Sequence, residues 1–489
     1  MLLTELLSAI PFYTSINMKN ELQINNIQMD HRKIDQGDMF ICIKGFTVDG
    51  HQFAEAAVQN GATVIVSEKE MEFQGATTII VPDTSRALAI LATKFFGNPT
   101  SQFPLVGVTG TNGKTTTTYL IDRICQEYRK KTGLIGTIQM KIGDNHYLIN
   151  NTTPDALHLQ RSFHQMVEEQ VDVAVMEVSS HALDLGRVYG CDFDIAVFTN
   201  LSQDHLDYHK DMNDYLRAKT LLFSTLGNTY EHHKKYAILN VDDKSSELIK
   251  KSTAQHILTY GIDEKADVMA DNIQFQINGT IFRLKTPHGE TKIHSKLMGK
   301  FNIYNMLAAT SAALALDIPL ETIKIALENI ESVAGRFEQV NEGQDYAVIV
   351  DYAHTPDSLE NVLQTIQEFK SGKVYCVVGC GGDRDRTKRP LMARVATKLS
   401  DFAIFTSDNP RTEDPKQILN DMIDGLQGTN YKVIENRKSA IEYAVNQAKK
   451  GDIVLIAGKG HETYQEINGV KYDFDDRIVA KEAILKKGQ

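Results

Sequence analysis

The chain has 489 residues, of which 42% are hydrophobic and 24% charged, a composition that is typical of folded globular proteins and argues against disorder. Its 52 basic and 63 acidic side chains give a formal charge of −11, which argues against a general nucleic-acid binder and against a polybasic membrane anchor. The length favours about three domains.

The first part of the chain, residues 1–98, reads as a small α/β domain. Short β-type runs alternate there with helical patterns and turn residues, at residues 39–43, 63–67 and 77–81. Gly97 and Pro99 then interrupt the pattern just before a new apolar run. We therefore predict a domain boundary at residues 98–99.

Two longer α/β stretches follow. Continuous apolar runs at residues 105–108, 171–178 and 194–199 indicate strands that are buried on both faces of a largely parallel sheet, in a central domain over residues 99–332. After a second break near residues 331–335, compact apolar runs again alternate with helical segments, at residues 347–350, 374–378, 402–405 and 453–456. This pattern predicts a C-terminal domain of Rossmann type over residues 333–489.

The most informative segment is Val-Gly-Val-Thr-Gly-Thr-Asn-Gly-Lys-Thr-Thr at residues 106–116, which joins an apolar strand to a helical pattern. This is the strand-loop-helix context of a P-loop, in which backbone N–H groups and a helix N-terminus bind phosphate. Lys114 would contact the β- and γ-phosphates of ATP, and the Thr115 hydroxyl would reach Mg²⁺. The strict P-loop pattern has glycine where this chain has Val108, so a glycine-rich turn with a chance Lys-Thr pair is the alternative.

Candidate metal ligands follow two further apolar runs. Glu177 ends one run beside a polar loop, and Asp204 and His205 come shortly after the next. Because ligands gather at the carboxyl ends of parallel strands, Glu177 can hold Mg²⁺ opposite the P-loop. The segment with His205 is either a metal site or a solvated loop.

Several motifs, in this order, resemble the Mur ligase family, the ATP-dependent ligases of peptidoglycan synthesis, over essentially the whole chain. The motifs are the P-loop, Glu-Val-Ser-Ser at 177–180, Thr-Asn-Leu at 199–201 with Asp-His at 204–205, Gly-Lys-Phe-Asn-Ile-Tyr-Asn at 299–305, Gly-Arg-Phe-Glu at 335–338 and Val-Asp-Tyr-Ala-His at 350–354. The resemblance implies an α/β protein of three domains, which bind a UDP-sugar peptide, ATP and an amino acid in chain order. It implies ATP-dependent addition of an amino acid to the D-glutamate γ-carboxylate of UDP-N-acetylmuramoyl-L-alanyl-D-glutamate through an acyl phosphate.

The resemblance also assigns catalytic and nucleotide-binding residues. The catalytic set would be Lys114, Glu177, His205 and Lys219, and Thr115, Glu177, His205 and Lys219 would hold Mg²⁺. Lys219 alone reads as an ordinary helical lysine, but the matching lysine of similar ligases is carbamylated, and the resulting anion could join a second Mg²⁺ site. The ATP-binding set would be Gly110, Thr111, Asn112, Gly113, Lys114, Thr115, Thr116, Asn302, Asn305, Arg336 and Asp351.

The incoming amino acid is expected to be meso-diaminopimelate. Asp408, Asn409, Pro410 and Arg411 resemble the corresponding motif of relatives that add this substrate. An arginine suits its second carboxylate, because a guanidinium forms two parallel charge-assisted hydrogen bonds with a carboxylate. Positions that match other contacts of this substrate are Arg384, Gly458 and Glu462. Arg411 as a plain surface arginine is the alternative.

The UDP-sugar peptide would lie between the first two domains. Positions that match its contacts in the family are Thr152, Thr153, Ser179, Arg187 and His31. His31 stands where many relatives have serine, so its role in uridine binding is open.

Three other readings stay open: the same ligase adding L-lysine, a ligase like folylpolyglutamate synthase, and a nucleotide switch without an amino-acid pocket. The chain has no apolar run near the roughly 18 residues that cross a bilayer, no basic leader before Glu5 and only five cysteines. We expect a cytoplasmic monomer without a nucleic-acid partner. We also expect Lys114, Arg187, Arg336, Arg384 and Arg411, together with Mg²⁺, to concentrate positive charge in the cleft, with the excess acid elsewhere.

Overall fold

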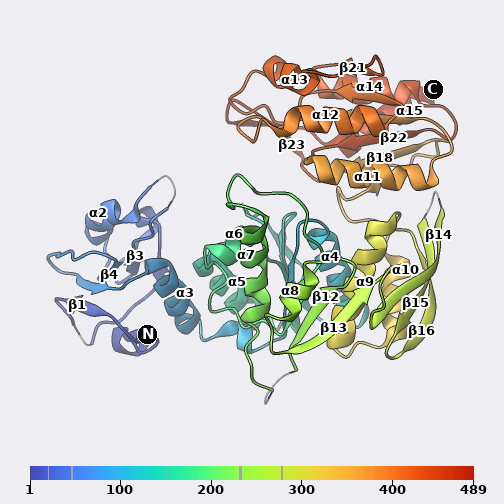
Figure 1. Ribbon diagram of the computed structural model, residues 1–489. Helices are drawn as coiled ribbons and strands as arrows, with labels where there is room; N and C mark the ends of the chain where they lie inside the picture. The colour runs from blue at the N-terminus through green and yellow to red at the C-terminus, as the bar shows by residue number, and fades with distance from the viewer. Residues whose placement is uncertain (20, 46–47, 150, 231–233, 277–278, 489) are drawn as a thin grey trace.

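The computed structural model describes residues 1–19, 21–45, 48–149, 151–230, 234–276 and 279–488. It is an α/β protein whose three main sheets form three successive bodies along the chain (Figure 1). Within the described residues, no helix is both long and apolar enough to cross a membrane.

The N-terminal sheet has the order β1-β5-β4-β3-β2. Its strands are β1 (Thr14–Ile16), β2 (Ile27–Gln28), β3 (Met39–Ile41), β4 (Val64–Ser67) and β5 (Thr77–Ile80), and its helices are α1 (Leu3–Leu7), α2 (Ala54–Gln59) and α3 (Thr84–Phe95). Strands β2 to β5 are parallel, whereas β1 pairs antiparallel with β5. The three predicted strands of this unit are β3, β4 and β5.

The central sheet has eleven strands in the order β16-β15-β14-β13-β12-β11-β6-β10-β7-β8-β9. The strands are β6 (Leu105–Thr109), β7 (Thr132–Ile135), β8 (Met140–Ile142), β9 (Asn145–Tyr147), β10 (Val173–Glu177), β11 (Ile195–Phe198), β12 (Tyr236–Asn240), β13 (His256–Gly261), β14 (Val268–Gln276), β15 (Gly279–Thr286) and β16 (Gly289–Ser295). Every residue of β6, β10 and β11 is buried, as their continuous apolar runs predict. The middle of the sheet is parallel, but β8, β9, β15 and β16 add antiparallel edges that the sequence did not predict.

Helices cover this sheet on both faces, and the sheet separates two apolar cores. They are α4 (Lys114–Glu127), α5 (Ala156–Glu168), α6 (Ser180–Asp184), α7 (Met212–Ser224), α8 (Ser246–Lys250), α9 (Lys300–Ala315) and α10 (Leu320–Asn329). Helix α9 is buried along almost its whole length, because it packs against α4 beneath the sheet. The first turns of α4 and α9 thereby lie near each other.

The C-terminal sheet has the order β17-β18-β22-β19-β20-β21, and it is parallel except for β17. Its strands are β17 (Glu338–Gln339), β18 (Ala347–Asp351), β19 (Val374–Val378), β20 (Phe402–Phe405), β21 (Tyr431–Val433) and β22 (Ile453–Ala457). Helices α11 (Pro356–Phe369), α12 (Lys388–Leu399), α13 (Pro415–Ile423), α14 (Arg437–Gln447) and α15 (Asp476–Lys487) cover both faces, and β23 (Tyr464–Ile467) and β24 (Val470–Asp473) form a separate hairpin. The predicted Rossmann-like pattern of alternating strands and helices is therefore present.

Candidate active site

A cavity of about 1230 Å³ lies where the carboxyl ends of the central strands face the C-terminal body. It is lined by the P-loop, by the segments that follow β10, β11 and β12, by the start of α9, and by the segment from the end of β18 into α11. In open α/β sheets, ligands bind outside the carboxyl ends of the strands, so this cavity is the candidate active site.

The P-loop connects β6 to α4 with the geometry that phosphate binding requires. Gly113 precedes α4 with φ of 87°, a conformation that favours glycine. A Cβ at Gly110 would overlap the Thr199 hydroxyl, so only glycine fits there. The first turn of α4 leaves N–H groups without intrahelical partners, and the helix dipole adds positive charge at the same place.

Two of the predicted ATP-binding residues already use their backbone N–H groups within the protein. Thr111 N–H donates to the Asn200 carbonyl at 2.8 Å, and Asn112 N–H donates to Asn200 Oδ1 at 2.9 Å. Lys114 Nζ donates to the carbonyls of Gly110 and Thr111 at 2.9 and 2.7 Å. The N–H groups that can face phosphate are therefore those of residues 113–116.

Glu177 ends β10 as a fully buried carboxylate directly beside the P-loop helix. It accepts hydrogen bonds from the Thr115 hydroxyl at 3.0 Å, from Thr137 N–H at 2.7 Å and from the Thr137 hydroxyl at 3.1 Å. Thr115 Oγ1 also accepts a bond from Arg336 Nη2 at 3.1 Å, which reaches across from the C-terminal body. Glu177 and Thr115 are adjacent oxygen donors, the ligand type that Mg²⁺ prefers.

Lys219 is buried in α7 with 1% of its surface exposed. Its Nζ donates to the Gly110 carbonyl at 2.8 Å and lies 4.3 Å from the centre of the Tyr215 ring. Burial, reinforced by the nearby Lys114 charge, lowers the pKa of Lys219 well below its ordinary value. A neutral amine is the form that can react with CO₂, so the surroundings suit carbamylation.

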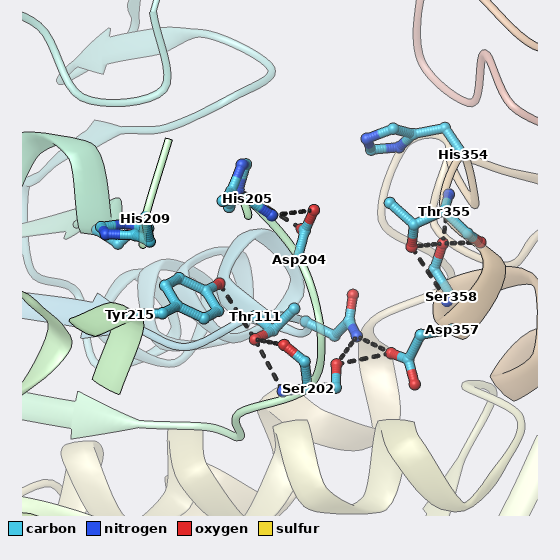
Figure 2. Close-up of polar contacts among 12 residues, drawn as sticks. Thr111, Ser202, Asp204, His205, His209, Tyr215, His354, Thr355, Asp357 and Ser358 are labelled. Carbon is cyan, nitrogen blue, oxygen red and sulfur yellow. Dashed lines mark hydrogen bonds and ion pairs between the residues drawn. The ribbon is translucent and has the colours of Figure 1, made fainter. Parts of the chain in front are cut away.

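His205 lines the same cavity but sits apart from Glu177 in the contact network. Its φ is 54°, and its Nε2 lies 3.5 Å from Asp204 Oδ2 (Figure 2). Its ring packs edge-on against His181. Burial lowers the pKa of His205 to about 4, so the imidazole is neutral at pH 7 and can donate a lone pair to a metal. Among the described residues, no three His, Cys, Asp or Glu side chains already converge as a metal site.

The remaining predicted nucleotide residues divide between α9 and β18. A Cβ at Gly113 would overlap Asn305 Oδ1, so that amide lies against the loop. Asn305 Nδ2 donates to Asn302 Oδ1 at 3.2 Å, and Asn302 itself is tied to the Met298 carbonyl at 2.9 Å. Asp351, at the end of β18, accepts two backbone N–H groups, and burial raises its pKa.

Four of the five residues predicted for the UDP-sugar peptide form one cluster beside Glu177. Thr153 Oγ1 donates to the Glu177 carbonyl at 2.8 Å, Ser179 N–H donates to Thr153 Oγ1 at 3.1 Å, and Arg187 Nη1 donates to the Thr153 carbonyl at 3.1 Å. Thr152 Oγ1 lies 3.1 Å from Thr137 Oγ1. His31 lies outside the cavity, in the N-terminal body, where its ring stacks on Phe53 at 4.5 Å.

The residues predicted to bind the amino acid gather at the carboxyl ends of β20 and β22. Asn409 Nδ2 donates to Glu462 Oε2 at 2.8 Å, and the fully buried Lys459 donates to both Asn409 Oδ1 and Glu462 Oε2 at 2.9 Å. Gly458 has φ of 114°, and a Cβ there would lie 2.6 Å from Asp408 Oδ2. Asp408, Asn409, Gly458, Lys459 and Glu462 therefore form a closely packed, charged cluster.

Arg411 and Arg384 face this cluster from two loops. Arg411 has φ of 51°, and its Nη1 donates to the Gly382 carbonyl at 2.7 Å while its Nε lies 3.5 Å from Glu466 Oε2. The Pro410 carbonyl accepts the Glu413 N–H at 3.0 Å, which fixes the turn before Arg411. Arg384 is exposed and lines the large cavity, whereas Arg411 and the residues of the charged cluster do not line it.

Sequence reasoning missed three residues of the site: Thr137, Asp357 and Lys459. Lys459 lies in a Gly-Lys-Gly run directly after a buried strand, which was a usable signal. Thr137 and Asp357 give no such signal, because their partners Glu177 and Asn112 are 40 and 245 residues away.

The P-loop, the buried carboxylate beside it and the charged cluster on the facing body define a P-loop protein built from several α/β units. Three family models match the chain: "Mur ligase family, catalytic domain" at residues 23–96, "Mur ligase middle domain" at residues 108–313 and "Mur ligase, glutamate ligase domain" at residues 335–460. The chain is 58% identical over 491 residues to UDP-N-acetylmuramoyl-L-alanyl-D-glutamate–2,6-diaminopimelate ligase of Oceanobacillus iheyensis, with both chains covered completely. The chain belongs to the Mur ligase family.

Solved structures agree with this assignment. A structure of a UDP-N-acetylmuramoyl-L-alanyl-D-glutamate–2,6-diaminopimelate ligase is 35% identical, covers all of both chains and has a TM-score of 0.72. A folylpolyglutamate synthase from Mycobacterium tuberculosis, complexed with ADP and AMPPCP, is 18% identical with a TM-score of 0.63 and covers 76% of this chain and 92% of its own. The second likeness shows the fold alone.

Proposed function

We propose that this protein is an ATP-dependent, ADP-forming ligase that adds meso-2,6-diaminopimelate to the D-glutamate γ-carboxylate of UDP-N-acetylmuramoyl-L-alanyl-D-glutamate in peptidoglycan precursor synthesis. The observation that carries the proposal is one cavity lined by the P-loop, by Glu177 and Lys219, by Thr152 and its neighbours, and by Arg384. Full-length identity of 58% to a ligase of that name supports the same substrates.

In the proposed reaction, the γ-phosphoryl group of ATP passes to the D-glutamate γ-carboxylate and gives an acyl phosphate. The amine of diaminopimelate then attacks the acyl carbon, and phosphate leaves as the amide forms. Lys114 and the first-turn N–H groups of α4 would stabilise charge on the transferring phosphoryl group. Thr153 and Arg187 would hold the sugar peptide beside Glu177. This position would direct the D-glutamate γ-carboxylate of the substrate toward the γ-phosphate of ATP.

Mg²⁺ fits beside the P-loop, where Thr115 and Glu177 would hold one ion. Glu177, His205 and carbamylated Lys219 would hold a second. Bound Mg²⁺ would neutralise negative charge on the phosphates during transfer. Thr115 must then turn its lone pair away from Arg336, which frees the guanidinium for phosphate. Carbamylation of Lys219 would replace a buried amine by an anion near Lys114, which adds one negative charge there.

Diaminopimelate is favoured over lysine because its distal end carries both an ammonium and a carboxylate. Glu462 uses Oε2 for Lys459 and Asn409, which leaves Oε1 directed to neither of them and able to accept an ammonium. Arg411 is the matching donor for the distal carboxylate, which lysine lacks. Lysine would leave this guanidinium without its carboxylate partner.

The test is phosphate release with UDP-N-acetylmuramoyl-L-alanyl-D-glutamate, ATP and Mg²⁺, with diaminopimelate or L-lysine as acceptor, and a mass spectrum of the product. We expect phosphate release and a tripeptide product with diaminopimelate only. Equal turnover with lysine would refute the specificity, and turnover with a folate and glutamate would favour a folylpolyglutamate synthase. A nucleotide switch would hydrolyse ATP without any amide product.

A further inference from the structure

Polar contacts join the C-terminal body to the P-loop at two places. Arg336 reaches the Thr115 hydroxyl at the start of α4. Asp357, in the first turn of α11, reaches the loop itself. Together the two contacts bracket the position where the phosphates of ATP are proposed to bind.

One oxygen atom of the Asp357 carboxylate accepts hydrogen bonds from two segments of the central body, the P-loop and the segment after β11. Its Oδ2 accepts hydrogen bonds from Ser202 Oγ at 2.7 Å and from Asn112 Nδ2 at 2.9 Å, and Figure 2 shows Ser202 and Asp357 facing each other. Asn361, one turn further along α11, donates to the same oxygen at 3.2 Å. Bonds to an ionised acceptor are about twice as strong as neutral ones.

The helix that carries Asp357 is fixed at its start. Thr355 and Ser358 form a reciprocal capping box, and Pro356 occupies the first helical position. A carboxylate in a first helical turn is also stabilised by the helix dipole. The start of α11, and with it Asp357, is therefore fixed by contacts within the helix itself.

The partners of Asp357 are tied directly to the P-loop. Ser202 N–H donates to Thr111 Oγ1 at 3.0 Å, and the Asn112 carbonyl accepts bonds from the side chains of Thr199 and Asn200. Asn112 thus directs its side chain to the C-terminal body rather than toward a phosphate. Movement of α11 would be transmitted to the loop through these bonds.

The contact of Asp357 differs from that of Arg336 in what ATP would do to it. Thr115 and Arg336 each have a proposed partner in the ATP complex, Mg²⁺ and phosphate, so their mutual bond must be exchanged. Asn112 Nδ2 and the Ser202 hydroxyl keep Asp357 as their partner. A carboxylate this near an anion site would repel ATP unless such donors neutralised it.

We propose that Asp357 is a positioning residue, which docks the C-terminal body on the P-loop through Asn112 and Ser202. The docking sets the amino-acid cluster of that body in register with the phosphates. The docking contact consists of hydrogen bonds within the protein, so the proposal rests on the proposed function only for its kinetic consequence.

The test compares Asp357→Ala and Ser202→Ala, singly and combined, with Glu360→Gln as the matched control. Glu360 lies on the same helix, and its carboxylate accepts a bond from Gln364 of that helix. We expect Asp357→Ala to lower kcat by about ten- to a hundredfold, the range for loss of hydrogen bonds to a charged group, with KM for ATP little changed. Because they share one contact, the Asp357 and Ser202 substitutions should be less than additive.

A second measurement follows docking without turnover. Small-angle scattering of the nucleotide-free protein should give a larger radius of gyration for Asp357→Ala than for wild type, and an unchanged value for Glu360→Gln. If Asp357→Ala fails to fold, Asp357→Asn serves, with a smaller effect in the same direction. Unchanged kcat and unchanged scattering would overturn the proposal, as would faster turnover, which would mean that the contact inhibits. If the wild type itself shows no diaminopimelate-dependent turnover, the proposed function is refuted instead.

Discussion

Lys219 gives the most direct test of the catalytic hypothesis, through Lys219→Met. The substitution keeps an unbranched apolar side chain of similar length in a site with 1% exposure, so packing against Tyr215 is preserved while the amine is lost. Lys219 lies 2.8 Å from the Gly110 carbonyl at the entry of the P-loop, so a carbamate there would act within the phosphate site. Loss of one such electrostatic group costs roughly 100- to 1000-fold in kcat.

The assay is phosphate release by Lys219→Met and Lys219→Ala, with and without formate or acetate. The alanine variant leaves space for a small carboxylate, so it should recover part of its activity, whereas the methionine variant should not. A ¹³C NMR signal from wild type in labelled bicarbonate, absent in both variants, would report the carbamate independently of activity. Full activity of Lys219→Met would refute the reasoning. So would the combination of an alanine variant that no carboxylate rescues and a wild type that shows no labelled carbamate signal.

Three further predictions concern the C-terminal body. Arg411→Ala should raise KM for diaminopimelate by about 10- to 100-fold and leave KM for ATP unchanged, because a charge-assisted pair is lost; unchanged preference over lysine would contradict this. The Arg389 guanidinium lowers the pKa of Glu413 from 4.5 to about 2, so their contact stabilises the fold above about pH 4.5 and is lost as the pH falls toward 2. Glu413→Gln should therefore flatten the acid side of a plot of melting temperature against pH. Arg437 and Asp476 form a fully buried ion pair, so Arg437→Met should lower the free energy of unfolding by about 3–5 kcal/mol in denaturant titrations, and Asp476→Leu in addition should restore part of it.

The sequence predicted those parts of the fold that depend on continuous burial. Strands β6, β10 and β11 were found because nearly all of their residues are apolar, and every residue is buried. Strand β14 was missed because its residues alternate between inside and outside and several are polar, so its apolar content is low. A polar strand such as β14 is stabilised by its neighbouring strands in the sheet, which a local sequence pattern does not record.

The candidate site divides in the same way. Lys114 was identified from the strand-loop-helix context of the P-loop, and Glu177 from its place at the end of an apolar run, where a parallel sheet gathers its ligands. Asp351 was identified only through the resemblance to the Mur ligase family. The bond between Asn112 and Asp357 spans 245 residues and depends on how two bodies dock, so no spacing rule could predict it. The roles of Lys114, Glu177 and Asp351 in binding stay predictions.

The side chains of the cleft do not by themselves supply the expected excess of positive charge. The cavity is lined by equal numbers of formally basic and acidic side chains, Lys114, Arg187, Lys219, Lys244, Lys300, Arg336 and Arg384 against Glu177, Asp204, Asp242, Asp243, Asp351, Asp357 and Glu368. Three anionic substrates cannot be held there by net side-chain charge. The acids are instead bound by donors of the protein itself, as Glu177, Asp351 and Asp357 are, which leaves the local field near each phosphate to individual cations. Carbamylation of Lys219 would add one more negative charge, so ATP affinity should depend steeply on Mg²⁺, and a weak dependence in a binding titration would contradict this balance of charge.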